Sequence, residues 1–340
     1  MKSRNMSSDS KAVLYSEGKL LSPSMDHAKI WLLNGLRVYS NYPFPFPSVS
    51  AACGMDMIIR YDGLVSRCAP DLSITNNPVW RQDADEWQLQ YHNRDTGDVL
   101  LFRFAPDGSL FSIQHSFPEW RDLPLIILNP ALAAALYLRN IPLIHGSAVS
   151  IHGASVILAG KSGVGKSTLT AALVAEGMPF LTDDLTALYL TEDSLAVEPG
   201  YPLLKISKET AGILGKSWKD LMPVATWSEE RWIQADGVTA FFCNVRMPVC
   251  GIYILEGRRG DISMPEIIEM SSAEACFALM GYLYGDRWLN IPGSGAIRLC
   301  AAIAGMAPVR RVWLPDGLNT LQKTARVLID DASSKKTMED

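Results

Sequence analysis

The hydrophobic and polar positions divide the chain into two regions with different periodicity. Between about residues 28 and 115, apolar, β-branched and aromatic residues recur in short runs separated by turn-forming residues, a pattern typical of strands. We predict strands at Ile30–Leu33, Leu36–Tyr39, Met55–Tyr61, Trp87–His92, Val99–Phe104 and Leu110–Gln114. This region should form a small, mostly antiparallel β-rich unit.

Turn signals and prolines punctuate this region. Asp62-Gly63 and Asp107-Gly108 are dipeptides typical of hairpin turns. Residues 42–47 alternate aromatic side chains with proline. Proline lacks the backbone N–H and fixes φ, so this segment should be neither an interior strand nor a helix.

From residue 130 onward, strand-like and helix-like runs alternate. Pro130 predicts the start of a helix over Ala131–Leu138, because its missing N–H costs little in the first turn. Strands are expected at His145–Ser150, Ser155–Ala159, Phe180–Thr182, Thr186–Leu190 and Val249–Leu255. A His152-Gly153 turn should join the first two. Further helices are expected at Thr168–Glu176, Ser272–Tyr284, Gly295–Ala304 and Gly317–Asp330. The alternation predicts an α/β fold, α+β for the chain as a whole.

These patterns suggest four segments: a polar tail at 1–25, a β-rich domain at 26–120, an α/β domain at 121–331 and a polar tail at 332–340. The 340 residues are 48% hydrophobic and 20% charged, which is typical of globular proteins. The net charge of −5 provides no strong basic field, so neither nucleic acid nor a membrane surface is expected as a partner.

Nothing in the sequence predicts secretion or membrane insertion. The N-terminus lacks the apolar core of a signal peptide. The apolar stretch Leu123–Leu138 is short and interrupted by Asn129 and Pro130, which favours a buried helix. The six cysteines show no C-x-x-C spacing and the five histidines no metal-ligand spacing. We therefore expect free thiols and a cytoplasmic protein.

A phosphate-binding loop follows the apolar strand Val156–Ala159 and precedes a helix, the context that this motif requires. Gly163 and Gly165 allow the loop backbone to approach phosphate oxygens. Lys166 should reach the β and γ phosphates of a nucleotide, and Ser167 should bind Mg²⁺. The candidate nucleotide-binding residues are Gly160, Lys161, Ser162, Gly163, Val164, Gly165, Lys166, Ser167 and Thr168.

Two adjacent carboxylates, Asp183 and Asp184, end the strand-like run Phe180–Thr182 shortly after this helix. Strand ends of this kind gather where ligands bind in α/β sheets. A carboxylate there can hold Mg²⁺ or accept the proton of an attacking hydroxyl. His145, at the start of the strand before the loop, is a weaker candidate, because a single histidine beside glycine is commonly structural.

His145-Gly146, the loop Gly160–Ser167 and Asp183-Asp184 together resemble the catalytic domain of the HPr kinase/phosphorylase family. That family phosphorylates a serine on a carrier protein, and its core is similar to that of phosphoenolpyruvate carboxykinase. The resemblance implies ATP and Mg²⁺ as cofactors. It also implies catalytic roles for Lys166, for Asp183 as the base, for Asp184 as its support and for His145 near the transferred phosphate. Ser167, Asp184 and Glu209 would be metal ligands.

The chain also departs from the family pattern. Thr168 stands where the family has glutamate, and Ala211 where its Glu-Ile-Arg-Gly signature has arginine. The basic segment that contacts the acceptor protein is not recognisable, although Arg231 or Arg246 could supply a cation. The segments Ile141–Val149 and 199–202 resemble a divergent branch associated with ribosomally made peptides. Some members of this branch, in lasso-peptide pathways, phosphorylate the C-terminal serine of the precursor.

Together with the loop and the paired aspartates, the resemblance implies an ATP-dependent serine kinase whose partner is a peptide or protein. A lasso precursor is the preferred acceptor, and a homo-oligomer is compatible with the resemblance. An HPr kinase/phosphorylase remains an alternative in the same class. A nucleotide-dependent switch or ATPase and a small-molecule kinase remain alternatives from other classes. Neither an Asn-Lys-x-Asp guanine-reading motif nor a Leu-Ser-Gly-Gly transporter signature occurs.

Overall fold

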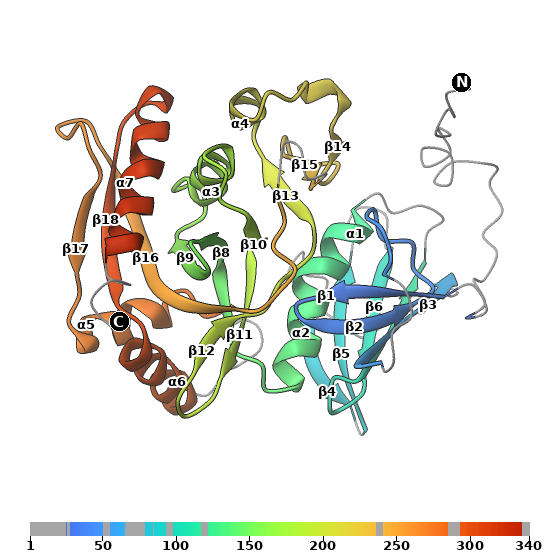
Figure 1. Ribbon diagram of the computed structural model, residues 1–340. Helices are drawn as coiled ribbons and strands as arrows, with labels where there is room; N and C mark the ends of the chain where they lie inside the picture. The colour runs from blue at the N-terminus through green and yellow to red at the C-terminus, as the bar shows by residue number, and fades with distance from the viewer. Residues whose placement is uncertain are drawn as a thin grey trace, which may run out of the picture.

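The protein has a mixed α/β architecture, seen in a computed structural model that describes residues 25, 28–49, 55–64, 79–83, 85–92, 98–116, 122–235, 241–284 and 293–334. Figure 1 shows an N-terminal β unit beside a larger α/β body. Most of the two predicted tails lies outside the described residues, as do Cys53 and Cys68.

Seven strands form the N-terminal sheet in the order β1-β2-β3-β7-β6-β5-β4. Most neighbouring pairs are antiparallel, whereas β3 runs parallel to both β2 and β7. The strands are β1 (Lys29–Leu33), β2 (Leu36–Ser40), β3 (Met57–Leu64), β4 (Val79–Asp83), β5 (Glu86–His92), β6 (Val99–Phe104) and β7 (Leu110–His115). The six strands expected from the hydrophobic pattern are confirmed, and β4 is additional.

One predicted turn is wrong. Asp62 and Gly63 lie inside β3, where the register with β7 shifts between Tyr61 and Gly63. Gly63 has a φ of 78°, so it provides a bulge in the strand where the dipeptide suggested a hairpin. The Asp107-Gly108 turn between β6 and β7 is confirmed: the Gly108 amide donates to the Ala105 carbonyl.

The predicted helix start at Pro130 is also wrong. The helical segment begins seven residues earlier, as α1 (Leu123–Ile126), and continues through the π-helix η3 (Ile127–Ala131) into α2 (Leu132–Leu138). Pro124 occupies the first turn of α1, where the missing N–H is harmless. Pro130 lies inside η3. Proline has no backbone N–H to donate, and the wider π-turn tolerates the missing hydrogen bond.

The larger sheet contains eight strands: β8 (Leu143–Ile151), β9 (Ala154–Gly160), β10 (Phe180–Thr182), β11 (Leu185–Leu190), β12 (Leu195–Val197), β16 (Met247–Arg259), β17 (Glu266–Glu269) and β18 (Val309–Pro315). β9 lies between β8, to which it is antiparallel, and β16, to which it is parallel. Because β10 is antiparallel to β8, it points the same way as β9. The carboxyl ends of β9 and β10 therefore meet at one edge of the sheet.

Helices cover both faces of this sheet (Figure 1). One buried cluster joins the sheet to α3 (Lys166–Ala175) and α7 (Leu321–Ser334), which runs past the expected end of the domain at residue 331. A second cluster joins the opposite face to α5 (Ser272–Met280) and α6 (Gly293–Met306). Alternate residues of β16 serve the two clusters: Tyr253 and Leu255 face the first, Ile252 and Ile254 the second.

A small third sheet lies next to α3 (Figure 1). It contains β13 (Leu203–Ile206), β15 (Arg231–Gln234) and β14 (Met222–Pro223), in that order. The remaining elements are α4 (Lys208–Ile213) and the 3-10 turns η4 (Trp218–Asp220) and η5 (Leu318–Thr320). Within the described parts of the chain, no helix combines the length and apolar character needed to cross a bilayer.

The N-terminal sheet and the larger body share one hydrophobic cluster. It runs from Trp31 and Phe102, through the buried residues of η3 and α2, to Leu185 and Leu203. Hydrogen bonds reinforce the joint: the turn between β1 and β2 donates from Gly35 N to Pro199 O and from Asn34 Nδ2 to Leu185 O, at 2.9 and 3.2 Å. The domain boundary near residue 120 stays a prediction.

Candidate active site

The phosphate-binding loop connects the end of β9 to the first turn of α3. Gly163 and Gly165 have φ values of 79° and 112°, a region that only glycine occupies readily. Gly165 is the N-cap of α3. The backbone N–H groups of the loop and the positive end of the helix dipole therefore face the same space at the N-terminus of α3. This geometry is suited to binding an anion such as phosphate.

Lys166 folds back over the loop. Its ammonium donates to the carbonyls of Gly160 and Lys161, at 2.9 and 3.3 Å, and the residue is 6% exposed. Burial lowers the pKa of Lys166, and the neighbouring Asp183 carboxylate partly offsets this effect. The lysine is therefore positioned before any ligand arrives.

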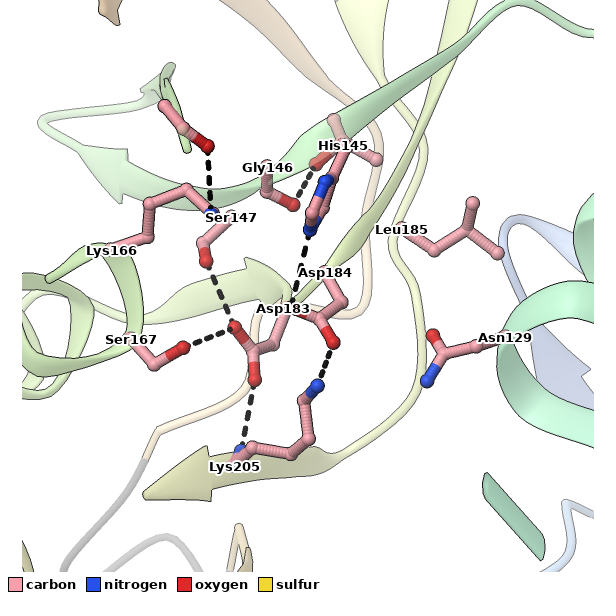
Figure 2. A network of polar contacts seen from close by, with 12 residues as sticks. Asn129, His145, Gly146, Ser147, Lys166, Ser167, Asp183, Asp184, Leu185 and Lys205 are labelled. Atoms are coloured by element: carbon pink, nitrogen blue, oxygen red, sulfur yellow. Dashed lines mark hydrogen bonds and ion pairs between the residues drawn. The ribbon is translucent and has the colours of Figure 1, made fainter. Parts of the chain in front are cut away.

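Asp183 lies at the end of β10, 3% exposed, and is held by three hydrogen bonds (Figure 2). Its Oδ1 accepts from Ser147 Oγ at 2.9 Å and from Ser167 Oγ at 3.4 Å. Its Oδ2 accepts from the backbone amide of Lys205 at 2.9 Å. The carboxylate thus contacts the hydroxyl of the phosphate loop directly.

Asp184 points in a different direction. It adopts the left-handed conformation, with φ 67°, which turns its side chain away from that of Asp183. One carboxylate oxygen forms an ion pair with the Lys205 ammonium, and the other lies 4.0 Å from Nε2 of His145. The Asp184 side chain is 18% exposed, so it is the more accessible of the two carboxylates (Figure 2).

His145 stands beside Asp184 on β8, against the edge of the Tyr284 ring. Burial, together with the charges of Lys166 and Lys205, lowers the pKa of His145 from 6.5 to about 4. The imidazole is therefore neutral at pH 7. It can donate one hydrogen bond and accept another, but it supplies no positive charge to a phosphate.

This shift predicts a pH dependence of stability. Between pH 6.5 and about 4 the unfolded chain binds a proton at His145 that the folded chain does not, so acidification lowers the free energy of unfolding. Wild type should lose more stability between pH 7.5 and 5.0 than His145→Gln, measured by urea unfolding. Equal losses would show that His145 titrates normally in the folded protein.

Gly146 has a structural role beside His145. It pairs with Ala159 across β8 and β9, and a methyl group on it would lie 2.6 Å from the Leu158 carbonyl oxygen. Gly146→Ala should therefore lower the free energy of unfolding by about 1–3 kcal/mol. Gly212→Ala on α4 is the matched control: its methyl group would meet open space, and that variant should not be destabilised. Equal effects on the two melting curves would contradict the steric explanation.

The structure does not bring every candidate to this network. Glu209 lies exposed in the first turn of α4, where its own backbone amide and Ser207 lower its pKa. Thr168 lies within hydrogen-bond distance of Thr210 on α4. Arg231 donates to the Leu221 carbonyl, and Arg246 forms an ion pair with Glu198. Both arginines are thus engaged elsewhere.

Two residues of the network were not predicted from the sequence. Ser147 lies two residues after His145 on β8, so both side chains belong to the same face of the strand. Lys205 interrupts the apolar run of β13, and a lysine in such a run indicates a buried partner charge. Both signals could have been found in the sequence, whereas the pairing of Lys205 with Asp184 could not.

Part of this chain is similar in sequence to known proteins. Residues 138–205 match the family described as the HPr Serine kinase C-terminal domain. An HPr kinase/phosphorylase of Peptoclostridium acidaminophilum is 39% identical over 70 residues, 21% of this chain and 23% of that relative. One of Lactobacillus acidophilus is 30% identical over 174 residues, 46% of this chain and 52% of that relative. The chain thus spans at most about half the length of these relatives.

Among solved structures, the HPr(Ser) kinase/phosphatase of Coxiella burnetii is similar at 13% identity and a TM-score of 0.33, covering 58% of this chain and 99% of that one. The family match falls on the segment that carries the phosphate loop and both aspartates. Residues 138–205, which include the phosphate loop and both aspartates, are therefore similar to the HPr Serine kinase C-terminal domain.

Proposed function

We propose that this protein is an ATP- and Mg²⁺-dependent serine kinase that transfers the γ-phosphate to a hydroxyl of a peptide or protein. One observation carries the proposal: the phosphate loop and the two aspartates meet at the same edge of the sheet, with Ser167 Oγ 3.4 Å from Asp183 Oδ1. A site that only binds nucleotide needs no second carboxylate beside the first. Here Asp184 lies next in the chain and faces a different direction.

The residues present fit a magnesium ion. Among the described residues, no three His, Cys, Asp or Glu side chains cluster to form a protein-only metal site. Mg²⁺ in phosphate-transferring sites commonly takes one or two protein oxygens and completes its shell with phosphate oxygens and water. Ser167 and Asp183 supply such a pair. Mg²⁺ held there would neutralise charge on the phosphate oxygens.

This arrangement favours an exchange of the roles expected for the two aspartates. Asp183 is nearly inaccessible and contacts the metal-side serine, which suits a carboxylate that positions Mg²⁺. Asp184 is more exposed and is oriented by Lys205 and His145. We propose that Asp184 is the base that accepts the proton of the attacking serine hydroxyl. The hydroxyl oxygen forms a bond to the γ-phosphorus, the bond to the β-phosphate oxygen breaks, and ADP leaves.

Lys166 and the loop amides would stabilise the charge that develops on the transferred group. Neutral His145, whose Nε2 lies 4.0 Å from an Asp184 carboxylate oxygen, would serve as its polar neighbour. We place the reaction in the cytoplasm, which agrees with the free thiols of Cys243, Cys250, Cys276 and Cys300.

The preferred acceptor is the C-terminal serine of a ribosomally made precursor peptide, such as a lasso precursor. This finer step rests on the resemblance of the segments around residues 141–149 and 199–202 alone. A second candidate is phosphorylation of HPr itself, favoured by the similarity to HPr kinase/phosphorylases over residues 138–205. The loss of the family's glutamate at Thr168 and arginine at Ala211 argues against it.

Mass spectrometry of phosphotransfer tests the proposal. The protein, Mg²⁺ and ATP are incubated separately with HPr and with a set of serine-terminated precursor peptides, and Asp184→Asn is the control. One added phosphate on a terminal serine, absent with the variant, would support the peptide kinase. Phosphate on HPr, removed again by inorganic phosphate, would support the second candidate. ATP hydrolysis with no phosphorylated acceptor would instead indicate an ATPase.

A further inference from the structure

The phosphate loop has two flanks, and the groups that would handle the acceptor occupy only one of them. β9 leads into the loop and lies between β8 and β16. Ser147 of β8 and Asp183 of β10 lie on the β8 flank. The opposite flank is formed by β16 and β18, which run parallel to β9 and end at the same edge of the sheet (Figure 1). Carboxyl ends of parallel strands are where such sheets bind ligands.

Arg258 lies on this second flank, near the end of β16. Leu255 pairs with Gly160 at the start of the loop, so Arg258 follows three residues beyond that point. A methyl group placed on Gly165 would lie 3.1 Å from Nη2 of Arg258. The guanidinium therefore stands beside the N-cap of α3, next to the loop backbone that would surround the phosphates.

Its position is fixed by the neighbouring strand. Nη1 of Arg258 donates to the Pro315 carbonyl, at the end of β18, at 3.2 Å. A single bond to a carbonyl leaves most of the guanidinium donors available, since arginine has five N–H groups. The side chain is thus anchored at one nitrogen, and the other nitrogen lies near Gly165.

The charge of Arg258 is not matched by an acid. Over the described ranges of the chain, Arg258 forms no ion pair with a carboxylate, whereas the next residue, Arg259, pairs with Asp261 and Glu266. An unpaired guanidinium beside a helix N-terminus attracts an anion, because both contribute positive potential.

We propose that Arg258 binds the nucleotide on the flank opposite the acceptor, donating to an oxygen of its α-phosphate. This inference rests on the proposed function. If the γ-phosphate lies on the Asp183 flank, the nucleoside leaves the loop over β16 and β18, and the α-phosphate is the anionic group that passes Arg258. Arg258 would then fix the end of the nucleotide that does not react, as Lys166 fixes the end that does.

Isothermal titration calorimetry with Mg²⁺ and three ligands tests this assignment: a non-hydrolysable ATP analogue, ADP and inorganic triphosphate. Arg258→Ala should weaken all three by about 10- to 100-fold, the range for hydrogen bonds to charged groups. The affinities of Arg258→Lys should lie between those of Arg258→Ala and wild type, because lysine keeps the positive charge but lacks the planar guanidinium. Arg259→Ala, which removes an equal charge one residue away, should bind all three normally.

In the kinase reaction, Arg258→Ala should raise the KM for ATP by a similar factor and leave the KM for the acceptor unchanged. Weaker binding of ATP and ADP with normal binding of triphosphate would overturn the inference, because Arg258 would then contact the base or ribose. Equal binding by the Arg258→Ala and Arg259→Ala proteins would also overturn it. If the wild-type protein binds no nucleotide, the proposed kinase function itself fails. If wild type binds nucleotide but Arg258→Ala binds it equally well, only the assignment of Arg258 fails.

Discussion

Replacing Asp184 by asparagine should slow phosphoryl transfer by orders of magnitude while leaving nucleotide and Mg²⁺ binding close to wild type. Asparagine keeps the shape of the side chain but cannot accept the proton of the attacking hydroxyl. The loss of a positioned general base corresponds to a fall in kcat of roughly 10²- to 10⁴-fold. Single-turnover transfer measured with saturating acceptor, together with calorimetry of the ATP analogue, would separate the two effects.

Asp183→Asn is the informative comparison. Its amide can still meet Lys205 N through oxygen and the hydroxyls of Ser147 and Ser167 through nitrogen, so the fold should be retained. In Asp183→Asn, phosphoryl transfer should fall sharply. Unlike in Asp184→Asn, the Mg²⁺ concentration that transfer requires should also rise, by about 10- to 100-fold, the range for groups that orient metal ligands. If the Mg²⁺ requirement rose for Asp184→Asn and stayed normal for Asp183→Asn, Asp183 would be the base and Asp184 the metal-side carboxylate, as the sequence resemblance implied.

Replacing Lys166 should weaken nucleotide binding as well as transfer. Hydrogen bonds to charged groups contribute about 1.5–3 kcal/mol, so ATP affinity should fall by about 10- to 100-fold. The turnover number should fall by a further 10²- to 10³-fold or so, because charge on the transferred group loses a preorganised donor. Lys166→Met is the better variant, since it preserves the buried stem of a residue that is 6% exposed.

Leu169→Met, one turn along α3, controls for altered packing near the loop, because Leu169 is fully buried and carries no charge. It should bind the ATP analogue like wild type in the same calorimetric titration. An unchanged affinity in Lys166→Met would remove the basis for assigning the loop to a nucleotide.

Much of the fold was predictable because the strongest signals are local. Alternation in the N-terminal half gave β1, β2 and β5 to β7 nearly to the residue, and the strand–loop–helix around Gly160 needed only its own motif. The failures arose where tertiary structure overrides a local rule. Pro130 ordinarily marks a helix start, yet a buried π-turn accommodates it. Asp62-Gly63 ordinarily forms a hairpin, yet β3 needed a bulge to pair with β7.

The candidate site was predictable in its members more than in its geometry. The motif identified Lys166 and Ser167, and proximity in sequence suggested the two aspartates. The sequence could not show that Asp184 takes a positive φ and so points away from Asp183. Nor could it show that Lys205, on a strand of a different sheet, contacts both. Such contacts depend on the path of the chain between residues 184 and 205.

The turn at Asn34 and Gly35 reaches the strand that follows Asp184, since Asn34 donates to the Leu185 carbonyl. The N-terminal sheet therefore supports the backbone immediately after Asp184 through this hydrogen bond. A shortened chain beginning at residue 121 would lose that support and would expose the apolar surface of η3 and α2 to water. We therefore expect truncation at residue 121 to disturb the candidate site, and we expect substitutions at Asn34, far from Asp184 in sequence, to disturb it as well.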